Sequence, residues 1–224
     1  MKKSFTIIFL LLFVSINSLV FAQEVTSVAY QVERFMNKGN WHEARKTITN
    51  FYKTLPVSGL TEEQAAEKKE VQRLEFRVDA VIRLEEASYA QISNQATIKD
   101  CDTYLATYPF GKYRVEVQWA KAKLVNTVSG YSEFISQNLT SSFAEEAKGK
   151  LASFEKGSIE KARSQNTAMA FQDYLNAYPT GIYAKEAQGK IVELREEEAF
   201  NLAQSTNTVA AYERFLVSFP TGKY

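Results

Sequence analysis

The C-terminal half of this chain is built from copies of one sequence block, and that repetition constrains its fold more than any other feature. The segment 171–183 aligns without gaps on the segment 212–224, 41 residues later, through the pattern aromatic-x-x-aromatic-Leu-x-x-aromatic-Pro-Thr-Gly-x-Tyr. A third copy occupies residues 101–113, and a degenerate copy without the Pro-x-Gly turn occupies residues 131–143. Such a period is typical of proteins in which each repeat is one supersecondary unit stacked on its neighbours.

The last copy indicates how one unit folds. Its apolar residues recur with the spacing of one α-helical face: Val209, Tyr212, Phe215, Leu216 and Phe219. Asn207 or Thr208 stands where a side-chain oxygen can cap the first amides of this helix. Pro220 ends the helix and Gly222 supplies a turn. We expect the equivalent turn glycine, Gly181, to adopt a positive φ. In the preceding copy a second helix runs from Tyr183 to about Gln204, with Leu202 among the apolar residues of its inner face. Each unit is therefore a helix hairpin whose apolar stripe is buried only by stacking.

The N-terminal part follows the same logic less regularly. A helix stripe from Val25 to Met36 ends at Gly39, the segment 41–55 forms a partner helix, and a long charged helix starts at Thr61. The sequence therefore predicts an all-α protein, an α-solenoid of stacked hairpins with about ten helices and no sheet. We divide it into a signal peptide (1–22), an N-terminal helix pair (23–60) and a repeat array (61–224) with turns near residues 109, 139, 179 and 220.

Two segments resemble known helical repeats. Residues 39–45, Gly-Asn-Trp-His-Glu-Ala-Arg, with a second element ending at Leu55-Pro56, resemble a tetratricopeptide repeat (TPR). The block 171–187 resembles the repeats of outer-membrane assembly lipoproteins and Tol–Pal accessory proteins. The period departs from that pattern, being near 40 residues rather than about 34, and the lipid-anchor cysteine of the lipoproteins is absent. The resemblance implies a scaffold that binds peptides or proteins and has no chemistry of its own.

The first 22 residues have the three-part pattern of a secretory signal. Lys2 and Lys3 precede an apolar run, and Val20-Phe21-Ala22 places small residues at a cleavage site before Gln23. An uncleaved anchor is the alternative, but a spanning helix needs about 20 apolar residues and this run is shorter. We therefore expect export to the periplasm or cell envelope of a bacterium, and no membrane span after cleavage.

Charge and composition narrow the function further. The chain has 27 Lys plus Arg against 26 Asp plus Glu, a net charge of +1, which disfavours nucleic acid and anionic lipid as partners. The single cysteine, Cys101, excludes an intramolecular disulfide and a cysteine zinc cage. His42 is the only histidine, so we interpret it as a helix-surface or packing residue. We expect no enzyme activity, no catalytic residue, no cofactor and no metal site.

Acidic and aromatic residues are numerous, and each group has a structural explanation. We interpret the adjacent glutamates as solvent-exposed helix faces: Glu62-Glu63, Glu85-Glu86, Glu145-Glu146 and Glu196-Glu197-Glu198. Aromatic residues on the repeated stripe are assigned to the core: Tyr104, Tyr108, Tyr174, Tyr178, Phe215 and Phe219. Trp119 and Tyr89 depart from the repeat and are the exposed candidates for partner contact. Neither is assigned as a binding residue, and the partner-binding residues stay unknown.

Two function hypotheses follow, from different classes. The first is an exported scaffold that holds a protein or peptide partner of unknown identity in a groove of the repeat array. The alternative is a module that binds a small ligand or a glycan for an envelope transport complex. The last predicted helix, 208–219, should leave an apolar side open. We therefore expect either a longer array or self-association through the C-terminal repeat.

Overall fold

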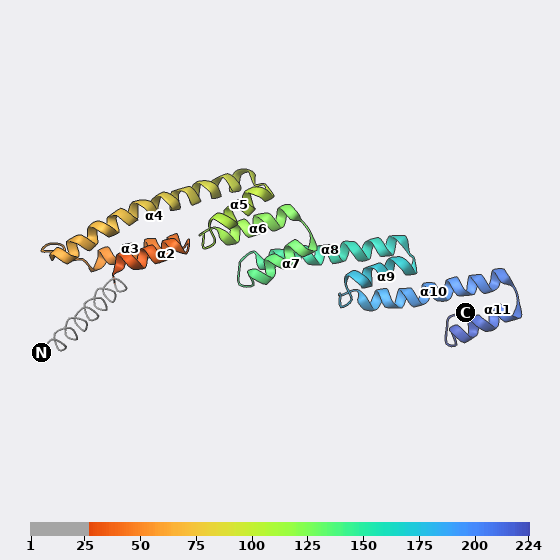
Figure 1. Cartoon of the computed structure of the whole chain (residues 1–224). Coiled ribbons are helices and arrows are strands. Elements are labelled where there is room, and N and C mark those ends of the chain that lie inside the picture. Colours follow the sequence, from red (N-terminus) through yellow and green to blue (C-terminus); the bar gives the residue numbers. More distant parts are fainter. Residues whose placement is uncertain (1–26) are drawn as a thin grey trace, which may run out of the picture. The chain divides into compact units, whose positions relative to one another are not determined.

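The computed structural model describes residues 27–224, which form ten α-helices and no strand (Figure 1). This confirms the predicted all-α fold of helical hairpins. The predicted signal peptide, residues 1–22, and Val25 of the first apolar stripe lie outside the described residues. Within the described range, no helix combines the length and the apolar character that crossing a membrane requires.

The chain divides into two compact units, with the boundary after Gly130. The helices of the first unit are α2 (Val28–Asn37), α3 (Trp41–Thr54), α4 (Glu62–Gln95), α5 (Ile98–Thr107) and α6 (Arg114–Val125). The boundary falls near the start of α7 (Val128–Gln137), and the second unit continues with α8 (Ala144–Gln165), α9 (Ala168–Ala177), α10 (Ala184–Thr206) and α11 (Val209–Ser218).

In the first unit, the long helix α4 is packed along its length by shorter helices. Helices α2 and α3 pack on its first half through Val32, Ile48 and Leu74, all fully buried. Helix α5 packs on its second half and on α6, through Cys101 and Tyr104. The two helix pairs therefore share α4 as a common support.

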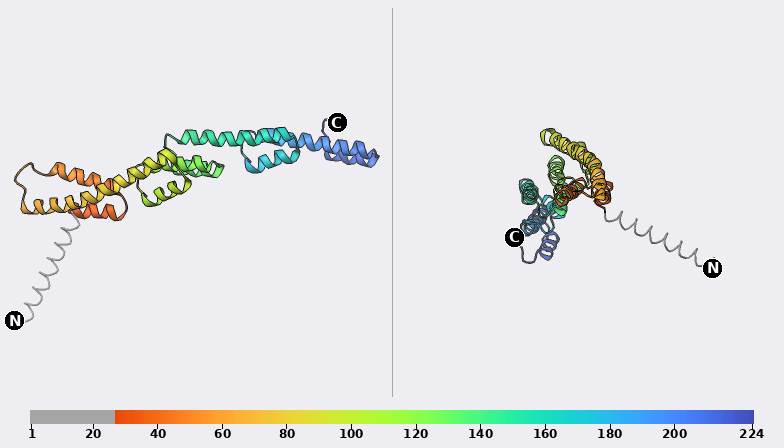
Figure 2. Two further views of the ribbon diagram at one scale, coloured as in Figure 1. Left: turned by 90° about the horizontal axis from the view of Figure 1, so that it is seen from above. Right: turned by 90° about the vertical axis from the view of Figure 1, so that its left-hand side faces the viewer.

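In the second unit, consecutive helices form a series of hairpins. Helix α9 lies alongside both α8 and α10, and α11 lies alongside α10 (Figure 2). Phe171 and Tyr174 of α9 are buried between their neighbours, as the repeated stripe predicted. Phe215 is the corresponding buried ring of α11. The inner-face prediction is wrong for Leu202, which is 68% exposed.

The Asn-Thr pair before each short helix has two separate roles. Thr208 caps α11 by accepting a hydrogen bond from the Ala211 amide, and Thr167 caps α9 in the same way. Asn207 instead ends α10 in the left-handed conformation, with φ 50°. Asparagine tolerates that conformation better than most residues, so the pair closes one helix and opens the next.

The repeat has glycine in its turn because a side chain would not fit there, and not because the backbone needs a positive φ. The sequence predicted a positive φ at Gly181, and this is wrong, since the positive-φ glycines of the described residues are Gly39 and Gly59. A Cβ atom at Gly181 would collide with the Glu155 carboxylate and the Tyr174 hydroxyl. The equivalent Cβ at Gly111 would lie 2.8 Å from Glu85 Oε1.

We expect Gly181→Val to lower the free energy of unfolding by about 1–3 kcal/mol, because the added side chain displaces a packed carboxylate and hydroxyl. Pro179→Ala should cost less than about 1 kcal/mol, because this proline mainly restricts the unfolded chain. Urea denaturation of both variants measures the difference. Equal midpoints with equal slopes would contradict the assigned role of Gly181.

Helix α11 leaves part of its surface uncovered. Val209 is 76% exposed, whereas Ala168, at the corresponding position of α9, is 8% exposed. Val217 is also exposed, and Phe219 is half-buried. The expected open apolar side of this helix is therefore present, and association through it stays a prediction.

Candidate binding grooves and the carboxylates beneath the turns

Glu85 of α4 is a buried carboxylate that joins several elements of the first unit. It is 1% exposed. Its Oε1 accepts hydrogen bonds from the Tyr104 hydroxyl at 2.7 Å and from the Lys112 amide at 2.6 Å. Its Oε2 lies 2.7 Å from His42 Nε2 of α3. The prediction of a solvent-exposed Glu85 is therefore wrong, and His42 is its polar partner from the N-terminal helix pair.

The same arrangement recurs in the second unit. Glu155 of α8 accepts a hydrogen bond from the Tyr174 hydroxyl at 2.7 Å, and the Tyr174 hydroxyl oxygen in turn accepts one from the Tyr183 amide at 3.3 Å. Glu196 of α10 accepts the amides of Lys223 and Tyr224. Glu196 is 8% exposed, so the expectation that it faces water is also wrong. Glu85 and Glu196 accept the amide of the lysine after the turn glycine, and Glu155 is linked to its turn through the Tyr174 hydroxyl.

A regular spacing marks these carboxylates in the sequence. The tyrosine that donates to each carboxylate lies 19 residues after Glu85 and after Glu155. In the degenerate copy, the two corresponding positions hold Val115 and Phe134, so both polar partners are replaced together. The last copy keeps Glu196 but has Phe215 at the tyrosine position, so the 19-residue Glu–Tyr spacing of two copies is the signal that could have revealed the buried pair.

The environment of Tyr174 changes its acidity. Burial, followed by the hydrogen bond to Glu155, raises the pKa of Tyr174 from 10.0 to about 12. The folded state therefore favours the neutral phenol. The contribution of the neutral Tyr174 phenol to stability is complete below about pH 10 and is lost as the pH rises through about 12.

An alkaline titration should reveal this shift. We expect the phenolate absorbance difference between the parent protein and Tyr174→Phe to appear near pH 12 rather than near pH 10. A difference spectrum that titrates with the exposed tyrosines would contradict the buried Tyr174–Glu155 contact. The comparison with Phe removes one hydroxyl and keeps the ring, so it isolates this group.

The two residues predicted as exposed partner contacts differ in their burial. Trp119 of α6 is 4% exposed, so this prediction is wrong. Tyr89 is half-buried and stacks on Tyr113, with the ring centroids 3.9 Å apart. Phe200 and Tyr224 form the equivalent stack in the last hairpin, with the centroids 4.4 Å apart. In both hairpins, the ring on the long helix therefore packs against the tyrosine that follows the turn.

Other groups with possible chemistry are also part of the packing. Burial raises the pKa of the Cys101 thiol, and its side chain is fully enclosed. Across residues 27–224, no cluster of three or more His, Cys, Asp or Glu side chains is placed to hold a metal ion. The open surface beside the hairpins is therefore the remaining candidate for a functional site.

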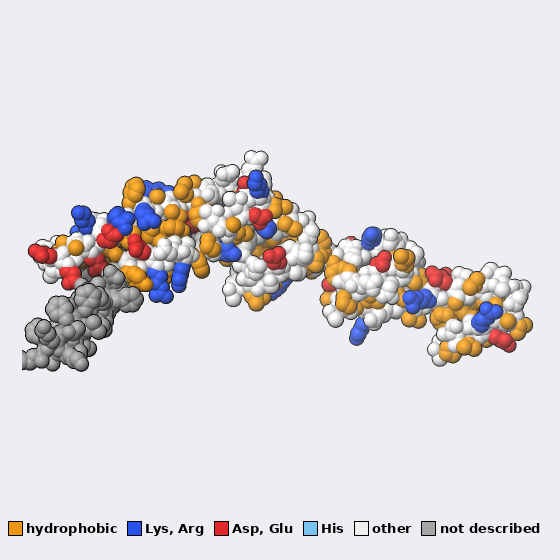
Figure 3. Space-filling view, in the orientation of Figure 1, with side chains coloured by type: hydrophobic (Ala, Val, Ile, Leu, Met, Phe, Trp, Pro, Cys, Tyr) orange, Lys and Arg blue, Asp and Glu red, His pale blue; other side chains and the backbone are white. Residues whose placement is uncertain are grey.

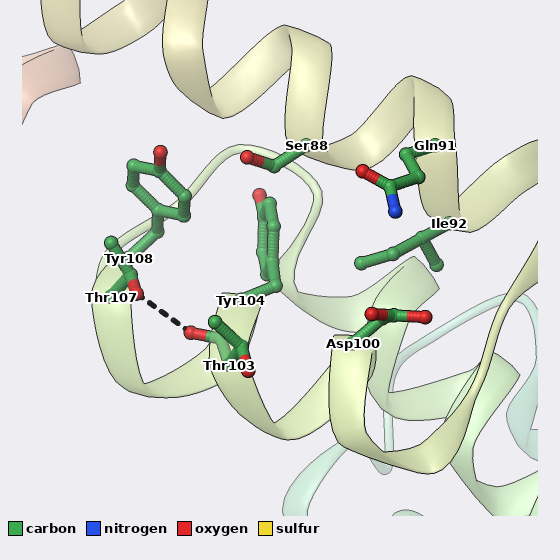
Figure 4. Close-up of a pocket in the computed structure, with 8 residues that line it drawn as sticks. All are labelled: Ser88, Gln91, Ile92, Asp100, Thr103, Tyr104, Thr107 and Tyr108. Atoms are coloured by element: carbon green, nitrogen blue, oxygen red, sulfur yellow. Dashed lines mark hydrogen bonds between the residues drawn. The ribbon is translucent and has the colours of Figure 1, made fainter.

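A small groove lies between α4 and α5 (Figure 4). Its volume is about 130 Å³. The residues that line it are Ser88, Gln91, Ile92, Asp100, Thr103, Tyr104, Thr107 and Tyr108. Figure 4 shows Ser88, Gln91 and Ile92 coming from one helix and the others from the facing helix, where Thr107 donates to the Thr103 carbonyl at 2.8 Å. We call it the α4–α5 groove.

A second groove lies between α10 and α11 and has a volume of about 220 Å³. The residues that line it are Ala199, Leu202, Ala203, Thr206, Ala211, Arg214, Phe215 and Ser218. We call it the α10–α11 groove. Seven of its eight residues stand 111 positions after a residue of the α4–α5 groove. The repeat therefore forms the same groove at the same place of two hairpins.

The linings of the two grooves differ in chemistry. Gln91 in the first groove corresponds to Leu202 in the second, and Thr103 corresponds to Arg214. The first groove is therefore mainly polar, and the second is mainly apolar with one cationic side chain. Figure 3 shows hydrophobic side chains exposed over α10 and α11.

Comparison with known proteins adds no family to this picture. The chain matches no protein-family model, and no curated protein matches it at a significant level.

Proposed function

We propose that this protein is an exported, non-catalytic TPR-like scaffold that binds a protein or peptide partner in the bacterial cell envelope. The observation that carries the proposal is the recurrence of one groove at equivalent positions of the α4–α5 and α10–α11 hairpins. A repeated groove suits a polypeptide, because a chain presents side chains to a helical scaffold at regular intervals.

The size of the grooves favours a polypeptide over the alternative, a small ligand or a glycan. Pockets for small molecules usually enclose about 300–1,000 Å³. The two grooves measure about 130 and 220 Å³, which is room for single side chains. Anchoring of a few side chains in shallow sites is how most protein interfaces gain their affinity.

Site-specific photo-crosslinking in intact cells tests the proposal. A photoreactive amino acid replaces Thr103 or Leu202 in the grooves, and Met169, which is 75% exposed on α9, serves as the control. We expect polypeptide adducts from the two groove positions and none from Met169. Adducts that form equally at Met169, or at no position, would contradict groove binding. Recovery of the adducts in the cytosolic fraction would contradict export.

A further inference from the structure

The α10–α11 groove is flanked by two arginines. Arg214 lines it, and Arg195 lies four residues before Ala199, about 40° from it around α10. Neither guanidinium forms an ion pair with any acidic side chain in the part of the chain that the structure describes. The Nε atom of Arg214 donates only to the Ala210 carbonyl, at 3.3 Å. Both cations therefore remain open to a partner.

One acidic residue borders the groove face. Glu198, four residues before Leu202, lies about 40° from Leu202 and about 100° from Ala199 around α10. Glu213 is about 100° from Arg214 around α11, on the side opposite Ala211 and Ser218. Glu196 is buried under the turn, where it accepts two backbone amides. The groove lining is thus mainly apolar with Arg214 as its charged side chain, and Glu198 and Arg195 stand at its edge.

Large apolar side chains stand next to these cations. Leu202 lines the groove and is 68% exposed, and the Phe215 ring forms its floor as a buried residue. Val217, three residues after Arg214, is exposed beside it. An apolar anchor can therefore enter next to Leu202 while an acidic group reaches an arginine.

The α4–α5 groove supplies an internal comparison. At the positions that correspond to Arg195 and Arg214 it has Leu84 and Thr103, so the same geometry exists without either cation. The charge of the α10–α11 groove is therefore not a requirement of the hairpin fold.

We propose that the α10–α11 groove binds a polypeptide segment that carries an Asp or Glu side chain within one helical turn of a large apolar side chain. The apolar side chain packs against Leu202, and the carboxylate forms charge-assisted hydrogen bonds with Arg214 or Arg195. This inference rests on the proposed scaffold function and specifies the partner of one of its grooves.

Selection of random peptides displayed on phage, with the purified protein as bait, tests the inference. The double variant Arg195→Leu, Arg214→Thr carries the residues of the equivalent α4–α5 positions, so the fold should tolerate it. We expect selected peptides to pair an acidic residue with Leu, Ile or Phe. Their binding, measured by fluorescence anisotropy, should weaken at least about tenfold in the double variant and should also weaken with added salt.

A matched control removes two other charges. Arg77 and Arg83 are exposed on α4, and their replacement by leucine changes the net charge by the same amount. This control should leave peptide binding unchanged, and Arg214→Glu should redirect the selection towards Lys and Arg.

The outcomes separate this inference from the proposed function. Peptides that bind the Arg195/Arg214 double variant as well as the parent would overturn the acidic preference and leave groove binding intact. An equal loss in the Arg77/Arg83 control would overturn it as well. If no peptide is selected and Leu202 and Thr103 yield no crosslinked polypeptide, both proposals fail.

Discussion

Truncation of Tyr174 to alanine should lower the free energy of unfolding by about 3–5 kcal/mol, the usual cost of removing a large buried ring. Tyr174 is 1% exposed and belongs to the core between α8, α9 and α10. Its ring centroid lies 5.5 Å from that of Tyr178 and 6.5 Å from that of Tyr183. The truncation therefore leaves a cavity and deprives Glu155 of a hydrogen-bond donor.

Chemical denaturation measures this loss, and Tyr174→Phe is the matched control. The phenylalanine variant keeps the ring and should lose only the hydroxyl contribution, about 1–2 kcal/mol. Phe215 fills the corresponding position of α11 without a hydroxyl. A loss below about 1 kcal/mol for the alanine variant would indicate that the ring lines a binding surface instead of the core.

Replacement of Glu85 by alanine should have a similarly large effect, about 3–5 kcal/mol. Without the carboxylate, the Tyr104 hydroxyl and the Lys112 amide lose their acceptor in a buried site, and His42 loses its contact. A buried donor without an acceptor destabilises the folded state by the full free energy of its desolvation. The turn before α6 and the contact between α3 and α4 should both loosen.

The neighbouring Glu86 provides the control for this prediction, because it is exposed on the same helix. Glu86→Ala should change the free energy of unfolding by less than about 0.5 kcal/mol. Hydrogen exchange of the Lys112 amide would show the local effect directly. Similar denaturation curves for the Glu85 and Glu86 variants would rule out the proposed role of the buried carboxylate.

The helices could be predicted because their signals are local. The prediction of a helix over residues 41–55 agrees with α3, Trp41–Thr54, and the predicted long helix after Thr61 agrees with α4. Apolar spacing, capping side chains and proline act within a few residues of one another. The repeated aromatic stripe was equally readable, and it placed Tyr104, Tyr174 and Phe215 in the core.

The burial of these carboxylates could not be predicted from the residues next to them in the sequence. Glu85 and Glu86 are adjacent and chemically identical, yet one is 1% exposed and the other faces water. The difference depends on Tyr104 and Lys112, which approach Glu85 from 19 and 27 residues away. Gly181 was misinterpreted for the same reason, because the group that excludes a side chain there belongs to Glu155 on another helix.

By itself, the sequence determined the class of fold, the positions of the helices and the existence of a repeated hairpin. These follow from helical periodicity and from turn residues, whose effects are confined to a few neighbouring positions. Only the tertiary structure decided which glutamates are buried and where a groove remains open between two helices. Those features depend on side chains brought together across helices, where packing and desolvation outweigh local preference.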